Sequence, residues 1–599
     1  MKKYVVYALI VLAVALIAAA CAPAPTPIPP TAVPAAPATA APVATTAPPV
    51  PATSAPAAGP KVLRIGRATY PDVIDPQKSS FGIEIEVMKF CYEGILAIDA
   101  KGAIGPGSAD KWTVAPDGKS IVFHIRDGLK RADGTALNAS DFEYALKRAV
   151  DPNLLGKQYA DILSDIKGAG ALVPLEGKKP SADELKKLYD AYGVKADDSK
   201  RELTVSFDAP APYWTYVAYI WETYVPDKKQ VDAAPDNWWN KATGHNCYGP
   251  FKIKSIEEGK RIVYEANPNY WRGKPKLDRI EVTYITDEAQ RFEAYKKDEF
   301  DILGVLPPSV QPQVDADAKL KGEMVRYAGA VTRAFLLNNT IKPMDNKQVR
   351  IAVSQMLNRT EWVRDVFKGQ GVPTTRWIPP GVPGAQPTKP GVPNSDAAAS
   401  VKTLVSAGFG TADGKVDCAK LGQIKLTFGS TAANRARFEW LAGQIQKTWG
   451  CNAVLDPVDP TVATSLVKDP KTHPQLAYGG WIQDYPHPQN WLSVYMKCGA
   501  FAKRFGYCNE ANDKLMSQAD STVDFDAAVK LYMQAEDTII ADIPLVFLVH
   551  EENIHMIKPW VMGPKDNPSS SDAEWAGEWG PVWTYDIDLT KVPATYPKQ

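Results

Sequence analysis

One pair of histidines has a spacing that invites comparison with a metal site. His550 and His555 enclose the run HEENIH, which looks like the HExxH motif of zinc proteases. That motif needs its two histidines four positions apart, so that both project from one face of a helix. Here they are five positions apart, directly after an apolar segment, 545–549, that is typical of a strand. Since the sequence also has no Gly-x-Ser-x-Gly elbow, P-loop or Cys-x-x-Cys pair, it predicts no enzyme, no bound metal and no cofactor.

The N-terminus has the layout of an export signal. Residues 1–20 begin with two lysines, continue with an apolar run from Tyr4 to Ile17, and end with three alanines before Cys21. A cysteine directly after small residues resembles the lipobox of bacterial lipoproteins, which implies a lipid on Cys21. The alternative is an uncleaved transmembrane anchor over residues 4–20. In both cases we expect the body outside the cytoplasm, periplasmic or anchored to the outer face of the membrane.

Residues 21–60 form a tether between this anchor and the body. The segment is dominated by proline and alanine and has no charge or aromatic residue, so it cannot bury a core. Proline keeps such a segment extended, with a reach on the order of 100 Å.

The body, from residue 61, has an ordinary globular composition with many tryptophans and tyrosines. Without the two lysines of the signal, 66 basic residues face 68 acidic ones, a net charge of about −2. No basic excess indicates a nucleic-acid partner, and no later apolar run is long enough to span a bilayer.

Six cysteines remain when Cys21 is set aside, an even number that favours disulfides in an oxidising compartment. Cysteines close in the sequence suggest two pairs, Cys498–Cys508 and Cys418–Cys451, and leave Cys91–Cys247 as the third. The sequence alone does not decide the connectivity, and unpaired buried thiols remain an alternative.

Strand and helix patterns alternate along the whole body, which predicts an α/β or mixed fold. The expected strands cover residues 61–69, 120–126, 250–264, 280–285 and 545–549. The expected helices cover residues 83–96, 138–149, 287–295, 345–358, 435–448 and 526–540, with a Pro/Gly-rich loop at 378–393.

Several phrases, taken in order, resemble the family 5 extracellular solute-binding proteins of bacterial ABC importers, the oligopeptide- and dipeptide-binding group. These phrases are Tyr92–Leu96 (YEGIL), Asp117–Lys130, Asp133–Phe142, Gly249–Phe251, Asn267–Trp271, Asn338–Thr340 with Val349–Ala352, and Trp481–Pro486 (WIQDYP). Most of them have a local structural reading as turns and caps. They therefore identify the fold and do not themselves identify the ligand.

The resemblance implies a two-lobed periplasmic-binding-protein type II fold, the Venus-flytrap arrangement, with an extra subdomain in lobe I. We expect lobe I over residues 61–330, with the subdomain near 106–205, lobe II over 331–549, and a return to lobe I over 550–599. Two crossovers between the lobes would form the hinge, and the ligand would lie in the cleft between them.

The resemblance also implies ligand residues in lobe II. Asp484 is expected to bind a peptide's α-ammonium through a charge-assisted hydrogen bond. The alternative is a turn in which its carboxylate is only a cap. Trp481 and Tyr485 flank it and would line side-chain pockets or pack in the core of lobe II.

Further contacts would come from two loops. The backbone after the first strand, at Ser80, Phe81 and Gly82, would pair with an extended peptide as an added strand does. A proline-rich segment at the cleft contains Arg376 and Trp377. There Arg376 would hold a carboxylate, or alternatively be an ordinary exposed arginine.

The function that follows is a substrate-binding lipoprotein, expected to be monomeric, that captures peptides and delivers them to an ABC permease and its ATPase. Two alternatives stay open. A receptor of the same fold could bind oligosaccharides on its tryptophans, and a secreted hydrolase or cell-wall chaperone could use the same scaffold.

Overall fold

The computed structural model describes residues 59–79, 82–98, 103–157, 159–468, 470–563 and 582–597. The chain divides into two units, residues 1–57 and 58–599, and the fold below is that of the second unit. The expected signal peptide, Cys21 and most of the tether lie outside the described residues. Within the described ranges, no helix combines the length and the apolar character needed to cross a membrane.

A nine-stranded sheet runs through both expected lobes. In spatial order its strands are β16 (Leu476–Ile482), β12 (Met324–Leu337), β17 (Leu545–Ile557), β11 (Ile302–Leu303), β1 (Val62–Arg67), β10 (Arg279–Tyr284), β9 (Arg261–Ala266) and β8 (Phe251–Glu257), and β13 (Val372–Pro373) pairs with β17. β1 pairs in parallel with β10 and β11, and the other neighbours are antiparallel.

β1 is buried along its whole length, although its sequence alternates apolar and polar residues. Its two arginines are buried because each has a carboxylate partner. Arg64 lies 2.6 Å from Asp301, and Arg67 lies 2.5 Å from Glu86 on α2 (Gly82–Cys91). A charge removed from water needs such a partner, so these pairs allow the strand to lie inside the sheet.

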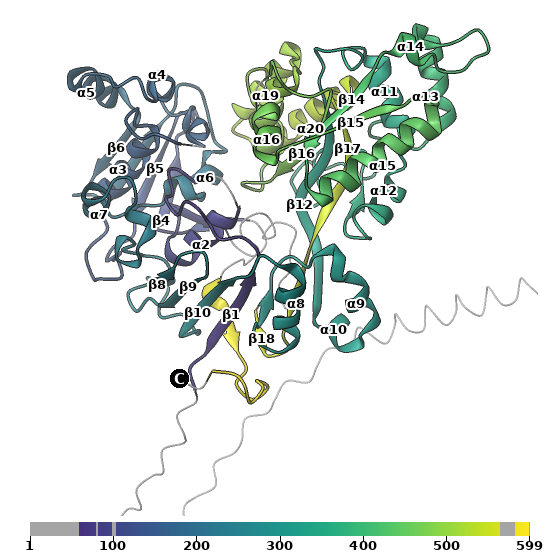
Figure 1. Ribbon diagram of the computed structural model, residues 1–599. Helices are drawn as coiled ribbons and strands as arrows, with labels where there is room; N and C mark the ends of the chain where they lie inside the picture. The colour runs from purple at the N-terminus through teal and green to yellow at the C-terminus, as the bar shows by residue number, and fades with distance from the viewer. Residues whose placement is uncertain are drawn as a thin grey trace, which may run out of the picture. The chain divides into compact units, whose positions relative to one another are not determined.

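β12 and β17 are the longest strands and lie side by side (Figure 1). Their register shifts between Ala328 opposite Glu552 and Thr332 opposite His550. The lobe boundaries expected from the sequence, 330/331 and 549/550, fall at this irregularity, and we use them below to name the lobes. The sequence predicted only the first part of β17 and did not predict β12.

Because β17 continues past residue 549, the HEENIH run belongs to a strand and not to a helix. His550 and His555 lie on a strand, where residues five positions apart project to opposite faces. His550 exchanges a hydrogen bond with Thr332 on β12, at 2.9 Å. Among the described residues, no group of three or more His, Cys, Asp or Glu side chains is placed to hold a metal ion.

Within lobe I, residues 109–206 contain a separate antiparallel sheet, which overlaps the subdomain expected near 106–205. Its order is β4 (Ala109–Val114), β5 (Ser120–Ile125), β7 (Glu202–Ser206) and β6 (Val194–Asp197). The helices and short strands of lobe I are α2, β2 (Leu96–Ile98), β3 (Ile104–Pro106), α3 (Ala139–Val150), α4 (Ala169–Leu172), α5 (Ala182–Ala191), α6 (Trp214–Val217), α7 (Lys228–Ala233), α8 (Glu288–Lys296), α9 (Gln311–Ala316), α10 (Ala318–Glu323), β18 (Val561–Met562) and β19 (Asp586–Ile587).

The expected helix over 83–96 is too long, because α2 ends at Cys91 and β2 follows. Gly94 lies between them in a close backbone approach, where a Cβ atom would come within 2.6 Å of the Tyr219 carbonyl oxygen. The chain can therefore turn here only with glycine.

Lobe II packs helices around β12, β16, β17 and the parallel pair β14 (Ile424–Gly429) and β15 (Ala453–Val458). Its helices are α11 (Lys347–Met356), α12 (Arg359–Asp365), α13 (Ala397–Leu404), α14 (Cys418–Leu421), α15 (Ala432–Trp449), α16 (Pro460–Lys468), α17 (Pro488–Trp491), α18 (Ser493–Met496), α19 (Glu510–Asp520) and α20 (Phe525–Asp542). The largest core cluster belongs to lobe I but also includes Tyr485 of lobe II, so apolar packing continues across the interface between the lobes.

Three disulfides join the six cysteines of the body. They are Cys91–Cys247, Cys418–Cys451 and Cys498–Cys508, the pairs named from the sequence. They close loops of very different length, 156, 33 and 10 residues. A longer closed loop removes more entropy from the unfolded chain.

We therefore expect that removing the disulfide with the longest loop destabilises the protein more than removing the one with the shortest loop. Replacing Cys91 and Cys247 by alanine should lower the free energy of unfolding by about 5 kcal/mol, against about 3 kcal/mol for Cys498 and Cys508. Urea unfolding of the two double variants measures both values. Equal losses, or a larger loss for the short loop, would contradict the loop-length argument.

Candidate functional site

A cavity of about 490 Å³ lies between the lobes, beside the two long strands. Lobe I contributes residues from α2 and from the segment after β11, and lobe II contributes the segment directly after α12, a residue of α15 and the end of β16. The lining residues are Gly82, Ile85, Val305, Pro308, Val331, Arg333, Val366, Phe367, Gln370, Arg437, Ile482, Gln483, Asp484, Glu551, Glu552 and Asn553. The cavity is thus bounded by segments that are far apart in the sequence.

Asp484 is held at the rim of this cavity by neutral partners. Asn490 on α17 donates a 2.8 Å hydrogen bond to its Oδ2, and the Tyr159 hydroxyl donates to the same oxygen. The backbone N–H of Asp484 donates in turn to Oδ1 of Asn490, at 3.0 Å. Tyr159 belongs to lobe I and Asp484 to lobe II, so this carboxylate joins the two lobes.

The surroundings of Asp484 disfavour its charge. Burial raises the pKa of Asp484 to about 6, although the hydrogen bonds from Tyr159 and Asn490 lower it. Among the described residues, both hydrogen bonds to the carboxylate end on Oδ2 and neither donor is a cation. A cationic ligand group at Oδ1 would therefore meet a carboxylate that still lacks a counter-charge.

Trp481 and Tyr485 support Asp484 and are not among the residues that line the cavity. The indole N–H of Trp481 donates to Asn490 at 2.8 Å, and its ring lies 5.0 Å from those of Tyr495 and Phe501. Tyr485 is fully buried, and its hydroxyl donates to Gln489. Trp481 thus packs against the core of lobe II, whereas Tyr485 packs with the core cluster of lobe I.

The expectations for Arg376 and Trp377 need correction. Arg376 is only 3% exposed and is not a surface arginine, because its guanidinium lies 2.5 Å from Glu536 and 3.0 Å from Asp537 on α20. Trp377 is fully buried, and its indole N–H donates to the Trp491 carbonyl at 2.7 Å. Both residues hold the proline-rich loop against lobe II, away from the cavity lining.

Of the backbone positions expected after the first strand, only Gly82 is described. It begins α2 and lines the cavity. Ser80 and Phe81 lie outside the described residues.

Two arginines at the cavity were missed from the sequence. Arg333 on β12 forms a bidentate ion pair with Glu551 on β17, with N–O distances of 2.8 and 3.0 Å. Burial opposes its charge, but the Glu551 carboxylate outweighs burial and raises the pKa of Arg333. No local pattern could reveal this pair, because the two residues lie more than 200 positions apart and meet only through strand pairing.

Arg437 on α15 is the second. Its Nη1 donates to Asn434 at 2.8 Å, and its guanidinium lies 4.3 Å from the centre of the Tyr478 ring. In the described part of the chain, its buried Nε–H has no hydrogen-bond acceptor. A buried donor without an acceptor is costly, so a ligand carboxylate or carbonyl at this point would be favourable.

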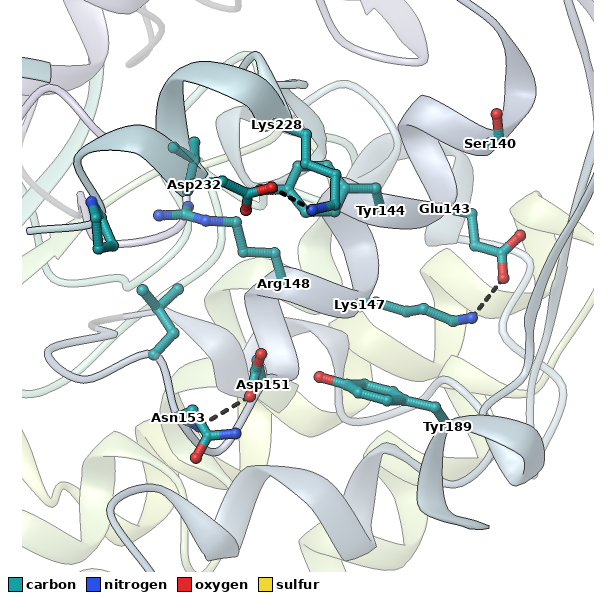
Figure 2. Close-up of a pocket in the computed structure, with 13 residues that line it drawn as sticks. Ser140, Glu143, Tyr144, Lys147, Arg148, Asp151, Asn153, Tyr189, Lys228 and Asp232 are labelled. Carbon is teal, nitrogen blue, oxygen red and sulfur yellow. Dashed lines mark hydrogen bonds and ion pairs between the residues drawn. The ribbon is translucent and has the colours of Figure 1, made fainter. Parts of the chain in front are cut away.

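A second cavity, of about 600 Å³, lies in the lobe I subdomain between α3, α5 and α7. Figure 2 shows two ion pairs among its side chains: Lys147 lies 2.6 Å from Glu143, and Lys228 lies 2.5 Å from Asp232. Arg148 pairs instead with Asp75, at 2.6 Å. These charges already have partners of opposite sign, whereas the described partners of Asp484 and Arg437 in the cavity between the lobes are neutral groups.

Comparison with known proteins agrees with this geometry. The sequence profile of the bacterial extracellular solute-binding proteins, family 5 (middle region), matches residues 103–503, about two thirds of the chain. The oligopeptide-binding protein OppA of Bacillus subtilis is 29% identical over 497 residues, which cover 81% of this chain and 87% of that protein. The periplasmic OppA of Salmonella typhimurium is 28% identical over 503 residues, 82% of this chain and 87% of that protein.

The fold is also that of solved structures. Haemophilus influenzae OppA, in complex with the peptide RPPGFSPFR, superposes with a TM-score of 0.70 at 22% identity, covering 88% of this chain and 99% of that one. The two-lobed type II fold with its extra subdomain is therefore established, and the family is one of binding proteins rather than enzymes. This chain belongs to family 5 of the bacterial extracellular solute-binding proteins.

Proposed function

We propose that this protein captures peptides in the cavity between its lobes and delivers them to an ABC permease, whose ATPase supplies the energy. One observation carries the proposal: in the cavity between the lobes, Asp484 presents a partly desolvated carboxylate that has no cationic partner among the described residues. Relatives named for oligopeptide binding, and a related structure with a bound peptide, support the same ligand class.

The charges around the cavity suit a zwitterionic chain. A peptide's α-ammonium would reach Asp484, and its carboxylate or a carbonyl would reach Arg437, whose Nε–H is unsatisfied. Gly82 would admit the peptide backbone close to α2. The cavity volume of about 490 Å³ lies in the range of small-ligand sites.

Capture would be coupled to closure through Tyr159. This tyrosine of lobe I already donates to Asp484 of lobe II, so a ligand on the same carboxylate contacts a group shared by both lobes. A ligand shifts the equilibrium toward closure only by the difference in its affinity for the two states. A ligand can contact α2, the strands β12 and β17, and Asp484 at the same time only when the lobes meet.

The proposal extends to the ends of the chain and to assembly. Being an extracellular solute-binding protein, the body lies outside the cytoplasm. We propose that a lipid on Cys21 retains it at the membrane, that residues 22–60 serve as a spacer, and that the protein acts as a monomer.

The first prediction tests the ammonium partner. Asp484→Asn keeps the shape of the side chain but removes its charge, so affinity for free peptides should fall roughly thirtyfold or more, about 2–5 kcal/mol. N-acetylated peptides should bind the wild type more weakly and lose little more in the variant, because both changes remove the same pair. Calorimetric titration of both peptide forms against both proteins gives the double cycle.

Asp232→Asn is the matched control, since it makes the same carboxylate-to-amide change in the charge-balanced cavity of Figure 2 and should leave affinity unchanged. Simply additive losses would show that Asp484 is not the ammonium partner. Binding of oligosaccharides but not of peptides would overturn the ligand class while leaving the fold intact.

The raised pKa of Asp484 gives a second prediction: its negative charge favours peptide binding but destabilises the ligand-free protein. Protonation of the Asp484 carboxyl, through a pKa of about 6, should by itself lower peptide affinity about tenfold between pH 7 and pH 5. Without ligand, the charged carboxylate is destabilising above that pKa. Asp484→Asn should therefore raise the free energy of unfolding by about 1–3 kcal/mol at pH 8, with the gain vanishing below pH 4.

Titrations at both pH values and urea unfolding at pH 8 and pH 4 measure these effects. A wild-type affinity that is flat over this range would contradict the role of Asp484.

The third prediction concerns anchoring. Cys21→Ser should release the protein from membranes or block its processing, since serine cannot carry the thioether-linked lipid. Fractionation and mass spectrometry of the N-terminus check this. A cleaved Cys21→Ser protein that stays on the membrane would contradict the lipid anchor.

A further inference from the structure

His487 lies buried where the two lobes meet, three residues after Asp484. Two rings of lobe I face it, Tyr213 and Tyr216, with centroids 6.0 and 5.2 Å from the imidazole. Two rings of lobe II complete the enclosure, Phe525 and Tyr532 on α20, at 5.6 and 5.7 Å. The imidazole is 4% exposed, so half of its enclosure depends on the lobes being in contact.

The same imidazole caps the helix that positions Asp484. His487 is the N-cap of α17, and its Nδ1 accepts the backbone N–H of Gln489 at 3.1 Å. The next residue on that helix, Asn490, holds both the backbone and the carboxylate of Asp484. Only the neutral imidazole can accept this hydrogen bond, because a protonated ring has a proton on both nitrogens.

Among the described residues, a positive charge on His487 would have no counter-ion in direct contact. At α6, Tyr213 donates to Asp165 of the same lobe, and Tyr216 adds only a phenol. From α20, Tyr532 donates to Asp520 at 2.6 Å, and Lys497 pairs with the same carboxylate. In the described part of the chain, Asp165 and Asp520 are thus engaged by these neighbours, and neither contacts the imidazole.

We infer that His487 is an acid-sensitive positioning residue and a latch between the lobes. Its neutral imidazole caps α17, which positions Asp484, and packs between tyrosines of both lobes. Protonation of this imidazole opens the lobes. A charged ring would lose the cap to Gln489 and would lie among apolar ring surfaces. Separation of the lobes removes Tyr213 and Tyr216 and admits water to the ring. The inference concerns lobe closure, so it does not depend on which ligand the cavity takes.

The direction of the pH dependence follows from linkage. Burial lowers the pKa of His487 to about 3 in the closed arrangement, whereas a solvated histidine has a pKa of about 6.5. The latch is therefore complete above about pH 6.5 and weakens as the pH falls below that value. Between pH 7 and pH 5 the closing equilibrium constant should fall about 25-fold.

Single-molecule FRET on the ligand-free protein tests this directly. Labels would replace Lys186 on α5 and Lys447 on α15, two exposed positions in different lobes. Protonation of His487 should add a rise of about 25-fold in the open-to-closed ratio from pH 7 to pH 5 in the wild type, beyond any change due to Asp484. This added rise should be absent in His487→Asn, where the amide oxygen still caps α17. Asp484 is present in both proteins, so its own titration cancels in the comparison.

Two further variants make the result decisive. His487→Phe fills the ring enclosure without titrating and should also lack the rise, which keeps the test open if the asparagine variant does not fold. His473→Asn is the matched control, because His473 is a buried histidine of lobe II outside this enclosure and should keep the wild-type response. An equal pH response of the wild type and both His487 variants, or an imidazole resonance of His487 that titrates near pH 6.5 while the lobes stay closed, would overturn the proposal.

Discussion

The backbone pairing of β12 with β17 is the interaction on which the rest of the structure depends. These strands belong to both lobes, and their ladder places Arg333 beside Glu551 at the cavity. The ladder also joins the strands of lobe II to β11 and β1 of lobe I, so one sheet is continuous through the molecule. The register of this pair shifts twice, between Ala328 and Thr332 and again between Arg333 and Ala334, and regular pairing restrains rotation least along this stretch.

The charged groups of the cavity can be compared with those of the scaffold. Several buried arginines of the scaffold have carboxylate partners, as Arg64 has Asp301, Arg148 has Asp75, and Arg376 has Glu536. Asp484 and Arg437 line the cavity, their described partners are neutral groups, and one buried donor of Arg437 is left without an acceptor. Since an uncompensated charge is costly in a folded protein, we infer that these two groups bind polar or charged groups of the ligand.

Closure and recognition share the same short stretch of chain. Asp484, His487 and Asn490 lie within seven residues, and α17 connects them. Tyr159 reaches the first of these from lobe I, and Tyr213 and Tyr216 reach the second. Protonation of Asp484 or His487, or binding of a ligand to Asp484, therefore acts on the contact between the lobes. This arrangement links the ligand's charge, the solution pH and the lobe equilibrium through a few neighbouring side chains.

The amino-acid sequence by itself determined the family and the α/β fold class, because motifs and local periodicity are written along the chain. It also suggested the cysteine pairs that the structure contains and singled out Asp484, which lines the cavity. It also placed several helices, such as α8, α11 and α20, within a few residues. It failed for β12, whose strand character depends on pairing with residues more than 200 positions away. The burial of Arg376, the gathering of Arg333, Glu551 and Arg437 at one cavity, and the enclosure of His487 were decided only by tertiary structure. Each depends on the proximity of distant segments, and burial and pairing, which set the charge state of a side chain, exist only once those segments have come together.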